Sequence, residues 1–390
     1  MSTGVAIVGV GWAGFRPVTP EASYKELMYE SAGRAYADAG IDPRTDVDSF
    51  VTVAEDFHEG TSIFDEYVPD QLGAMQRPVH TITGDGLHGL AAAVMQILTG
   101  RFRIVVVEGH SKASNILTLS EITAYAMDPI VNRPLGVHPV AVAALEASRY
   151  LHETGTTHAQ CAAAAAKNRR NALRNPSAAY GAEVSAEQVM ASDVLASPLT
   201  RLEISDHADG AIVMVLADAQ TALRLAAPPV WVRGIGWAND SPSLESRSWS
   251  RAVYAERAAA MAYRMAGIDD PARAIRFAEV DDTYAYKELQ HLEALGLCGP
   301  GQAGPMTAAG ETGPSGRLPV NVSGGSLGAG HLLEATGLAK VLEVVLQIRG
   351  QAGTRQLRDA STGLAQSWRG VPTTSGAVAV LSATPDGRAA

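Results

Sequence analysis

The segment Leu318–Gly337, which reads LPVNVSGGSLGAGHLLEATG, decides the fold. A short apolar run predicts a strand that ends at Asn321, and a glycine-rich turn follows it. From Leu332 to Ile348 the chain reads as a buried helix that ends before Gly350. The segment therefore predicts a strand, a glycine loop and a helix, in that order.

The residue between the glycine loop and the helix is His331. Backbone N–H groups of such a loop can hold a negatively charged oxygen, and this order of elements places His331 beside them. The same pattern also fits a tight strand-to-helix turn that the histidine merely caps. Both interpretations stay open on this stretch alone.

The composition bounds the class of protein. The chain has 390 residues, 46% hydrophobic and 18% charged, and this balance predicts one large core or two fused ones. The formal charge of −10 and the lack of a basic run beyond Arg169–Arg170 argue against a nucleic-acid partner. We expect no membrane span and no signal peptide. Cys161 and Cys298 lie far apart, which predicts no disulfide framework and a reducing, cytoplasmic compartment.

Near the N-terminus, Gly9–Gly14 spells the GxGxxG pattern of dinucleotide-binding loops. That fingerprint needs a helix that begins among the glycines, whereas Pro17 and Pro20 follow them and prevent one. We therefore predict no nucleotide site here. The first helix instead covers Ala22–Ala39.

The first half of the chain then alternates strands and helices. Its predicted elements are the strand Val47–Ala54, a third strand that starts at Thr81–Thr83, the helix Leu87–Leu98, the strand Arg103–Glu108 and a closing strand, Asp206–Leu216. A helical insertion, Ser111–Thr200, interrupts this order, with helices over Ala141–Glu153 and Ala159–Arg174. A long excursion above a sheet usually forms a lid or a substrate cover.

The second half repeats the first. Val230–Ala238 reads VWVRGIGWA, against VAIVGVGWA at Val5–Ala13, and the offset between further matching segments is nearly constant. In order along the chain, Gly84–Gly89 then corresponds to Gly324–Gly337, and Arg103–Glu108 to Gly376–Leu381. A duplicated unit of alternating strands and helices predicts two doubly wound sheets packed against each other. We place the halves at residues 1–225, with an insertion at about 111–200, and 226–390.

Seven motifs span nearly the whole chain. They are GLHGLA at 86–91, EGHSKA at 108–113, KNRRNALRNP at 167–176, HADGA at 207–211, DDTYA at 281–285, LEALGLC at 292–298, and the asparagine, glycines, histidine and ATG of 321–337. Together they resemble the thiolase superfamily, in particular the thiolase-like part of sterol carrier protein X and the thiolase-like steroid side-chain aldolases. The resemblance implies an α/β fold, the duplicated thiolase fold, with five-layered αβαβα packing and a helical loop-domain insertion. It also implies an obligate dimer and a pocket for coenzyme A thioesters.

The chain departs from this family where the family carries its nucleophile. The position of the nucleophilic cysteine falls on Gly86, and glycine has no side chain to form an acyl-enzyme. The position of the second thiolase cysteine falls around Thr373–Gly376, which holds no thiol. We expect Cys161 and Cys298 to be packing residues.

Several candidate catalytic residues remain. The resemblance aligns His331 with the histidine of the family's Gly-His-Pro loop, although Leu332 replaces the proline. Asp281 aligns with a position that holds water or moves a proton in the family, so an aspartate there is a candidate general base. Its neighbour Asp282 is more easily explained as a structural carboxylate. Tyr284 is a candidate phenol donor, with core packing as the alternative.

Two histidines and an aspartate in the first half complete the candidates. His58 follows a strand at its carboxyl end, where loops meet the pocket, and is a candidate catalytic residue. Asp85 is expected to cap the following helix, and His88 faces either solvent or the pocket. We expect the following residues to contact the coenzyme A thioester: Gly86, Asn321, Gly324, Gly325 and Ser326.

The sequence thus predicts an enzyme that makes or breaks a carbon–carbon bond beside a coenzyme A thioester without covalent catalysis. Its preferred form is retro-aldol cleavage of a β-hydroxyacyl-CoA, in which Asp281 or His331 removes the β-hydroxyl proton. Two alternatives stay open, a Claisen-type acyltransferase or thiolase subunit, and a non-catalytic acyl-CoA-binding scaffold. The resemblance implies a homodimer and a small zinc-ribbon/OB-fold partner. We expect no metal site and no tightly bound cofactor in this chain.

Overall fold

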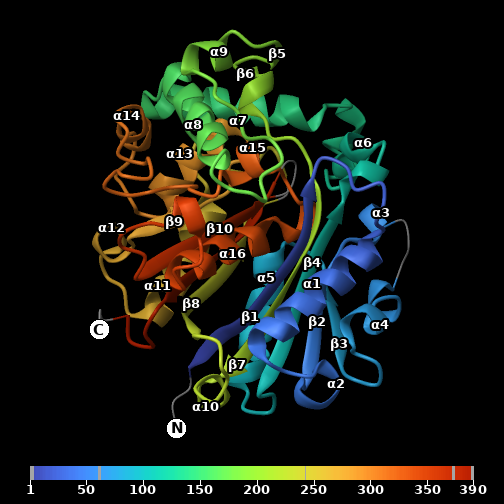
Figure 1. Ribbon diagram of the computed structural model, residues 1–390. Coiled ribbons are helices and arrows are strands. Elements are labelled where there is room, and N and C mark those ends of the chain that lie inside the picture. Colours follow the sequence, from blue (N-terminus) through green and yellow to red (C-terminus); the bar gives the residue numbers. More distant parts are fainter. Residues whose placement is uncertain (1–3, 60–62, 242, 371–373, 388–390) are drawn as a thin grey trace.

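A computed structural model describes residues 4–59, 63–241, 243–370 and 374–387, and it builds the chain around one large sheet (Figure 1). The nine strands lie in the order β3-β2-β4-β7-β1-β8-β11-β10-β9. The first half contributes β1 (Val5–Arg16), β2 (Ser49–Val53), β3 (Val79–Ile82), β4 (Ile104–Lys112) and β7 (Asp209–Asp218). The second half contributes β8 (Val230–Asn239), β9 (Phe277–Glu279), β10 (Thr362–Arg369) and β11 (Ser375–Ser382).

The two halves meet where their first strands pair. Val5–Ile7 of β1 runs antiparallel to Val230–Val232 of β8 over three residue pairs. Farther along, β1 pairs with β7 and β8 pairs with β11, so the two halves of the sheet diverge. The two predicted sheets are therefore joined at one end.

Apart from the edge strand β3, the sheet order is symmetric about this junction, and it corrects one predicted correspondence. β4 is parallel to β2 and antiparallel to β7, while β10 is parallel to β9 and antiparallel to β11. The counterpart of β4 is thus β10, and β11 corresponds to β7. The predicted match of Arg103–Glu108 with Gly376–Leu381 is wrong. The reason is that β10 carries the buried polar residues Gln366 and Ser367, which hide its strand pattern.

Helices complete five layers. α1 (Tyr24–Ala39) covers β1 and β7 on one side, and α11 (Val253–Ala266) covers β8 and β11 on the other (Figure 1). α5 (Gly86–Leu98) and α16 (Thr336–Ile348) pack against each other between the two halves of the sheet. α5 contacts strands of both halves, and α16 contacts β9, β10 and β11. The duplicated α/β thiolase fold with αβαβα layers is confirmed.

The GxGxxG pattern serves helix packing. β1 runs straight through these glycines, as the prolines predict. A Cβ atom at Gly9 would lie 2.5 Å from the carbonyl oxygen of Ala35 in α1, and one at Gly11 would lie 2.1 Å from that of Ser31. In β8, Gly234 and Gly236 stand equally close to α11. The glycines let each outer helix lie directly on its strand.

The insertion lies above the sheet, at the top of Figure 1. Its main helices, α7 (Pro139–Thr154) and α8 (His158–Ala172), agree with the predicted pair. The shorter elements of the chain are α2 (Pro43–Asp46), α3 (Asp56–Glu59), α4 (Pro69–Leu72), α6 (Leu119–Ala124), α9 (Ala186–Met190), β5 (Val194–Ala196), β6 (Leu199–Thr200), α10 (Ala219–Ala222), α12 (Pro271–Ala274), α13 (Ala285–Ala294), α14 (Ala303–Ala308), α15 (Gly325–Ala329) and the 3₁₀ turn η5 (Leu333–Ala335).

A buried ion-pair network fixes the insertion to the second half. Glu146 of α7 pairs with Lys287 of α13, and its other oxygen lies 2.5 Å from a guanidinium nitrogen of Arg247. The ammonium group of Lys287 also stands 4.3 Å from the centre of the Trp368 ring. These groups are all buried, so loss of one partner would leave an uncompensated charge. Within the described ranges, no helix has the length and apolarity needed to cross a bilayer.

Candidate functional site

A cavity of about 670 Å³ opens between the insertion and the loops of both halves. Its apolar wall comes largely from the insertion, including Ile116, Leu119, Ile122, Pro139 and Val140. The lining also includes groups that can carry chemistry. They are Glu55, His58, Asp85, His207, Tyr284, His331, Glu334 and Arg369.

His331 lies in this cavity beside a second histidine, His207. The N–H of His331 donates to the carbonyl of Asp206 at 2.8 Å, and its own carbonyl accepts the N–H of Ala208 at 2.9 Å. The centres of the two imidazole rings are 5.3 Å apart, edge to face. Two positive charges at that distance repel by about 3 kcal/mol at an effective dielectric constant of about 20. The pair therefore disfavours a second proton.

The surroundings of His331 select its neutral form. Burial lowers its pKa well below the usual value, and the nearby basic side chains of His207, Lys340 and His58 lower it further. The N–H of Leu333 donates to its Nδ1 at 3.2 Å. Because Nδ1 accepts, the proton of the neutral ring resides on Nε2. His331 is thus suited to donate a hydrogen bond to an oxygen in the cavity.

His58 forms a pair with a carboxylate. It lies in α3, directly after β2, and its Nδ1 is hydrogen-bonded to the side chain of Glu334 in η5. Glu334 is almost fully buried, whereas His58 retains some exposure to the cavity. A carboxylate that accepts the Nδ1 proton leaves Nε2 as a proton acceptor and stabilises the imidazolium that forms. This arrangement suits a general base.

Asp85 joins the N-termini of the two central helices. One oxygen accepts the N–H of Leu87 at 2.9 Å, as the predicted cap of α5, and the other accepts the N–H of Gly337 in α16 at 2.8 Å. Burial raises the pKa of Asp85, and hydrogen bonds from these groups act in the opposite direction. His88 lies beside Asp85, with its Nδ1 3.4 Å from the Asp85 N–H, and lies outside the cavity lining.

The space next to Gly86 is filled. A Cβ atom there would lie 2.5 Å from Cγ of Leu338 and 3.0 Å from its backbone nitrogen. Gly86 is buried and does not line the cavity. Residue 86, where we expected the position of the family's nucleophile, therefore has no room for a side chain in this packing.

Neither cysteine reaches the cavity. Cys161 is buried in α8, and burial raises its pKa above the usual range. Cys298 is half-buried, and burial raises its pKa to about 12. Thr373 lies outside the described residues, and the remaining residues of that stretch, 374–376, are absent from the cavity lining.

Tyr284 forms part of the cavity wall. It packs edge to face with Trp368, 6.1 Å between ring centres, and stacks on Tyr286. Among the described residues, its hydroxyl has no hydrogen-bond partner. Burial raises its pKa above the usual range, so the phenol stays protonated. Both the predicted donor role and the packing role are therefore compatible with its placement.

Asp281 lies behind this wall and does not line the cavity. One carboxylate oxygen accepts the N–H of Thr283 at 2.9 Å, and the other has no partner among the described residues. Burial raises its pKa to about 6, although Lys340 opposes the shift. The structure gives Asp281 a perturbed carboxylate outside the cavity lining, so its role as base stays a prediction.

The glycine loop holds one of the chain's own carboxylates. Asp282 accepts the N–H groups of Ser326 at 2.6 Å and Leu327 at 3.2 Å, and the ammonium of Lys340 lies 3.1 Å away. A Cβ atom at Gly325 would lie 2.1 Å from Asp282. The predicted negative oxygen in this loop thus belongs to Asp282, which is the structural carboxylate that we expected.

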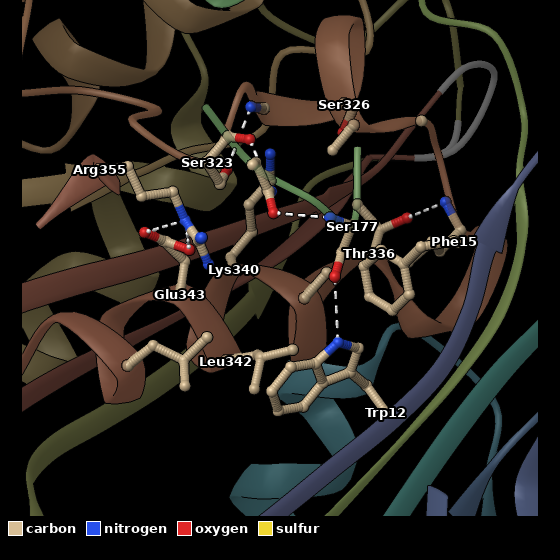
Figure 2. A pocket seen from close by; sticks show the side chains of 17 residues that line it. Trp12, Phe15, Ser177, Ser323, Ser326, Thr336, Lys340, Leu342, Glu343 and Arg355 are labelled. Atoms are coloured by element: carbon tan, nitrogen blue, oxygen red, sulfur yellow. Dashed lines mark hydrogen bonds and ion pairs between the residues drawn. The ribbon is translucent and has the colours of Figure 1, made fainter. Parts of the chain in front are cut away.

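The remaining predicted thioester contacts lie away from the large cavity. Asn321 donates to Glu288 at 2.8 Å and accepts the N–H of Val280 at 2.8 Å, and Gly324 packs against Ala172. Gly325 and Ser326 instead line a second cavity of about 40 Å³ under the glycine loop (Figure 2). Figure 2 shows the ion pair of Arg355 with Glu343 and the bond from Trp12 to Ser177 at its edge. This space accommodates a few water molecules but no thioester.

Sequence reasoning missed His207, Glu334 and the ion pair of Arg369 with Glu55. His207 stood within a family motif but had no assigned role. Glu334 follows His331 by three residues, and that spacing could have signalled it. The pairing of Glu334 with His58 joins distant parts of the chain and leaves no trace in the sequence.

Comparison with known proteins gives relatives of several activities. The thiolase C-terminal domain-like family matches residues 236–383. Acetyl-CoA acetyltransferase of Methanothermobacter thermautotrophicus is 31% identical over 368 residues, 92% of this chain and 94% of the relative. Human sterol carrier protein 2 is 30% identical over 92% of this chain and 69% of its own length. The 17-hydroxy-3-oxo-4-pregnene-20-carboxyl-CoA lyase of Mycobacterium tuberculosis is 27% identical over 96% of this chain and 98% of the lyase.

Solved structures of an aldolase and a thiolase also superpose on this chain. The Ltp2-ChsH2(DUF35) aldolase superposes with a TM-score of 0.83 at 26% identity, over 97% of this chain and 98% of that chain. Human mitochondrial 3-ketoacyl-CoA thiolase superposes with a TM-score of 0.73 at 14% identity, over 98% and 99%. At that identity the second likeness concerns the fold alone.

Proposed function

Because this chain belongs to the thiolase superfamily, in the branch of the sterol carrier protein 2 thiolases and steroid side-chain lyases, we propose that it cleaves a carbon–carbon bond of a β-hydroxyacyl-CoA without a cysteine nucleophile. It is an enzyme that acts on acyl-CoA, as a lyase or an acyltransferase of that superfamily. Among the reactions of these two enzyme classes, we propose the retro-aldol cleavage for this chain.

One observation carries this proposal. The cavity combines an imidazole–carboxylate pair with a neutral imidazole donor, while the nucleophile position at Gly86 is closed by Leu338. A retro-aldol cleavage needs a base for the hydroxyl proton and a donor for the enolate oxygen, and it needs no covalent intermediate. A thiolase reaction needs a nucleophile, and no cysteine side chain lines this cavity within the described ranges.

In the proposed reaction, His58 acts as the base and His331 as the hydrogen-bond donor. Nε2 of His58, positioned by Glu334, takes the proton of the β-hydroxyl group, and the carbon–oxygen bond becomes a carbonyl. The bond between the α- and β-carbons breaks, and its electron pair forms the enolate of the thioester. Nε2–H of His331 donates to the enolate oxygen. Protonation of the α-carbon then completes an acyl-CoA and an aldehyde or ketone.

Other predicted residues keep a place in this proposal. The phenol of Tyr284 is a further donor toward the substrate, since its hydroxyl is available at the cavity wall. Asp281 gives way to His58 as the preferred base because it lies behind that wall. The loop of Asn321, Gly324, Gly325 and Ser326 supports the site indirectly rather than by touching the thioester, because the N–H groups of Ser326 and Leu327 hold Asp282.

We also propose a small zinc-ribbon/OB-fold subunit as partner, together with a homodimer in the cytoplasm. The aldolase structure with the most similar fold described above contains a DUF35 component, which supports such a partner. Acyl-CoA is then a substrate shared with that subunit, and this chain holds no tightly bound cofactor of its own.

The experiment uses the tagged chain purified from its own host with any subunit that accompanies it. β-Hydroxyacyl-CoA thioesters with different acyl groups are supplied, and the carbonyl product is trapped as a hydrazone while the protein mass is recorded. We expect a carbonyl product and no acyl adduct, with rates at least about 100-fold lower for His58→Asn and His331→Ala. Cys161→Ala and Cys298→Ser are the controls and keep the rate.

Two outcomes would contradict the proposal. An acyl adduct that disappears in a cysteine variant would favour Claisen-type acyl transfer, the chemistry named for the acetyltransferase relative. Binding of acyl-CoA without any conversion, in wild type and variants alike, would favour a scaffold.

A further inference from the structure

We propose that His207 is the acid that protonates the α-carbon of the enolate. This inference rests on the proposed function and assigns its last proton transfer. The HADGA motif that contains His207 was noted in the sequence without a role.

His207 keeps its ring nitrogens open to the cavity. It lies on the loop before β7, and its side chain is exposed where it lines the cavity. Within the described part of the chain, neither ring nitrogen takes part in a hydrogen bond, and only the backbone carbonyl is engaged, by the hydroxyl of Tyr180. A substrate atom can therefore reach either nitrogen.

The other histidines that line the cavity are His58, His138 and His331, and each uses a ring nitrogen in a hydrogen bond. Nδ1 of His58 is bonded to Glu334, so His58 is suited to accept a proton. Nδ1 of His331 receives the N–H of Leu333, so its Nε2–H is directed to an oxygen. Nδ1 of His138 accepts the N–H of Val140 at the start of α7. Among the four imidazoles that line the cavity, His207 is the one with both ring nitrogens outside any hydrogen bond in the described part of the chain, so we assign the carbon to it.

The geometry of the histidine pair matches the enolate. In an enolate, the oxygen and the α-carbon are two bonds apart, and both carry negative charge. The rings of His331 and His207 are 5.3 Å apart and edge to face, and their backbones are paired, so the spacing of the two donors is fixed. One imidazole can serve the oxygen while the other serves the carbon.

The charges around His207 also favour transfer of a proton from its ring to the α-carbon. The pKa of His207 is lowered, chiefly because protein atoms surround it, and the nearby His58 lowers it further while Asp206 opposes the shift. An imidazolium with a lowered pKa gives up its proton more readily. Asp206 is itself paired with Arg201, which limits its stabilisation of the His207 cation.

The protons balance over one cycle. His58 gains the proton of the β-hydroxyl group, and the His207 imidazolium loses one to the α-carbon, forming a carbon–hydrogen bond. The electron pair for that bond comes from the enolate. Water in the open cavity then takes a proton from His58 and returns one to His207.

The experiment isolates carbon protonation from bond cleavage. The tagged chain, purified from its host with its accompanying subunits, is incubated with propionyl-CoA in D₂O, and deuterium at the α-carbon is measured by mass spectrometry. Cleavage of a β-hydroxyacyl-CoA is measured in parallel. We expect exchange in wild type, a loss of at least about tenfold in His207→Asn, and retained exchange in His58→Asn. His152→Gln, an exposed histidine of α7 outside the cavity lining, is the matched control.

The outcomes separate the two proposals. Wild-type cleavage with unchanged exchange in His207→Asn would overturn the role of His207 and leave the retro-aldol function intact, as would wild-type cleavage without any exchange. Neither cleavage nor exchange in a wild-type protein that binds acyl-CoA would overturn the proposed function itself. If His207→Asn unfolds, His207→Gln is measured in its place, with circular dichroism to verify the fold.

Discussion

Asp85 and Gly337 stand at the N-termini of different central helices, and a hydrogen bond of 2.8 Å between them joins the two copies of the repeat beside the cavity. A Cβ atom at Gly337 would lie 1.8 Å from the Asp85 carboxylate, so glycine permits this contact. The carboxylate thus fixes α5 against the start of α16. His331 and Glu334 lie in the segment that directly precedes α16 in the chain.

Asp85→Asn should destabilise the protein. An amide keeps one acceptor for the N–H of Leu87, but it presents an NH₂ group to the N–H of Gly337. A buried donor left without an acceptor costs about 1–3 kcal/mol in the free energy of unfolding. Urea unfolding measures the loss. Asp42→Asn is the control, because Asp42 caps an exposed short helix through a single backbone N–H, of Arg44, and asparagine caps equally well. Equal stability of both variants would refute the bridging role.

Glu334→Gln should lower kcat more than it raises KM. The amide still accepts the Nδ1–H of His58 but no longer stabilises the imidazolium that forms when His58 takes the proton. We expect a kcat about ten- to hundredfold lower. The acidic limb of the pH–rate profile should move to lower pH, since the cation loses its carboxylate partner.

The control for this variant is Glu183→Gln, which removes an exposed carboxylate that pairs with Arg170. A purely structural role of Glu334 would reduce the amount of folded enzyme without moving the pH profile, and that result would count against the imidazole–carboxylate pair as base.

Tyr284→Phe tests whether the phenol meets the substrate. Loss of one hydrogen bond to the substrate costs about 1 kcal/mol, or about fivefold in kcat/KM, while the stability should change little because the hydroxyl has no protein partner among the described residues. Tyr286→Phe is the matched control. Its hydroxyl is buried and has no partner within the described ranges, and its ring stacks on Tyr284. That control should keep activity and equal or exceed wild-type stability, and the same loss in both variants would assign Tyr284 to packing alone.

Asp281→Asn should change how stability depends on pH. Burial raises the pKa of Asp281 to about 6 in the folded protein, against about 4 in an unfolded chain. The folded state therefore holds this proton more tightly, and stability falls as the pH rises from about 4 to about 6. A difference of about two pKa units corresponds to about 3 kcal/mol at neutral pH. The stability of the variant relative to wild type should rise by up to that amount between pH 4.5 and pH 7.5.

Urea unfolding at several pH values measures this change, and Asp269→Asn, at an exposed position, should show none. Activity adds a second readout. Retained cleavage in Asp281→Asn would agree with His58 as the base, whereas a loss with an intact fold would return that role to Asp281.

The fold was largely open to prediction because its signals are local and repeated. The segment around His331, the matching first strands and the two halves could be identified from residue patterns, and the likeness to known thiolases confirms the fold that they predict. The strand β10 was not predicted because two of its buried side chains, Gln366 and Ser367, are polar. The Gln366 side-chain carbonyl accepts the N–H of Asp281 at 2.9 Å, a long-range bond that no local pattern reveals.

The site was less predictable because it depends on what each group faces. A glycine loop with free N–H groups looks the same in the sequence whether it holds a ligand or a side chain, and here Asp282 occupies it. Asp281 and Tyr284 are three residues apart, yet only Tyr284 lines the cavity. His58 was identified from its place after a strand, but its partner Glu334 comes from the other half of the chain.

The contact of Leu338 with Gly86 has a consequence for how this branch can change over time. Any side chain at residue 86 would bring its Cβ atom to 2.5 Å from the Cγ atom of leucine and disturb the central helices. On the proposed correspondence of residue 86 with the thiolase nucleophile, a thiol there would also require a smaller residue at 338. Loss of the nucleophile would then be hard to reverse by a single mutation.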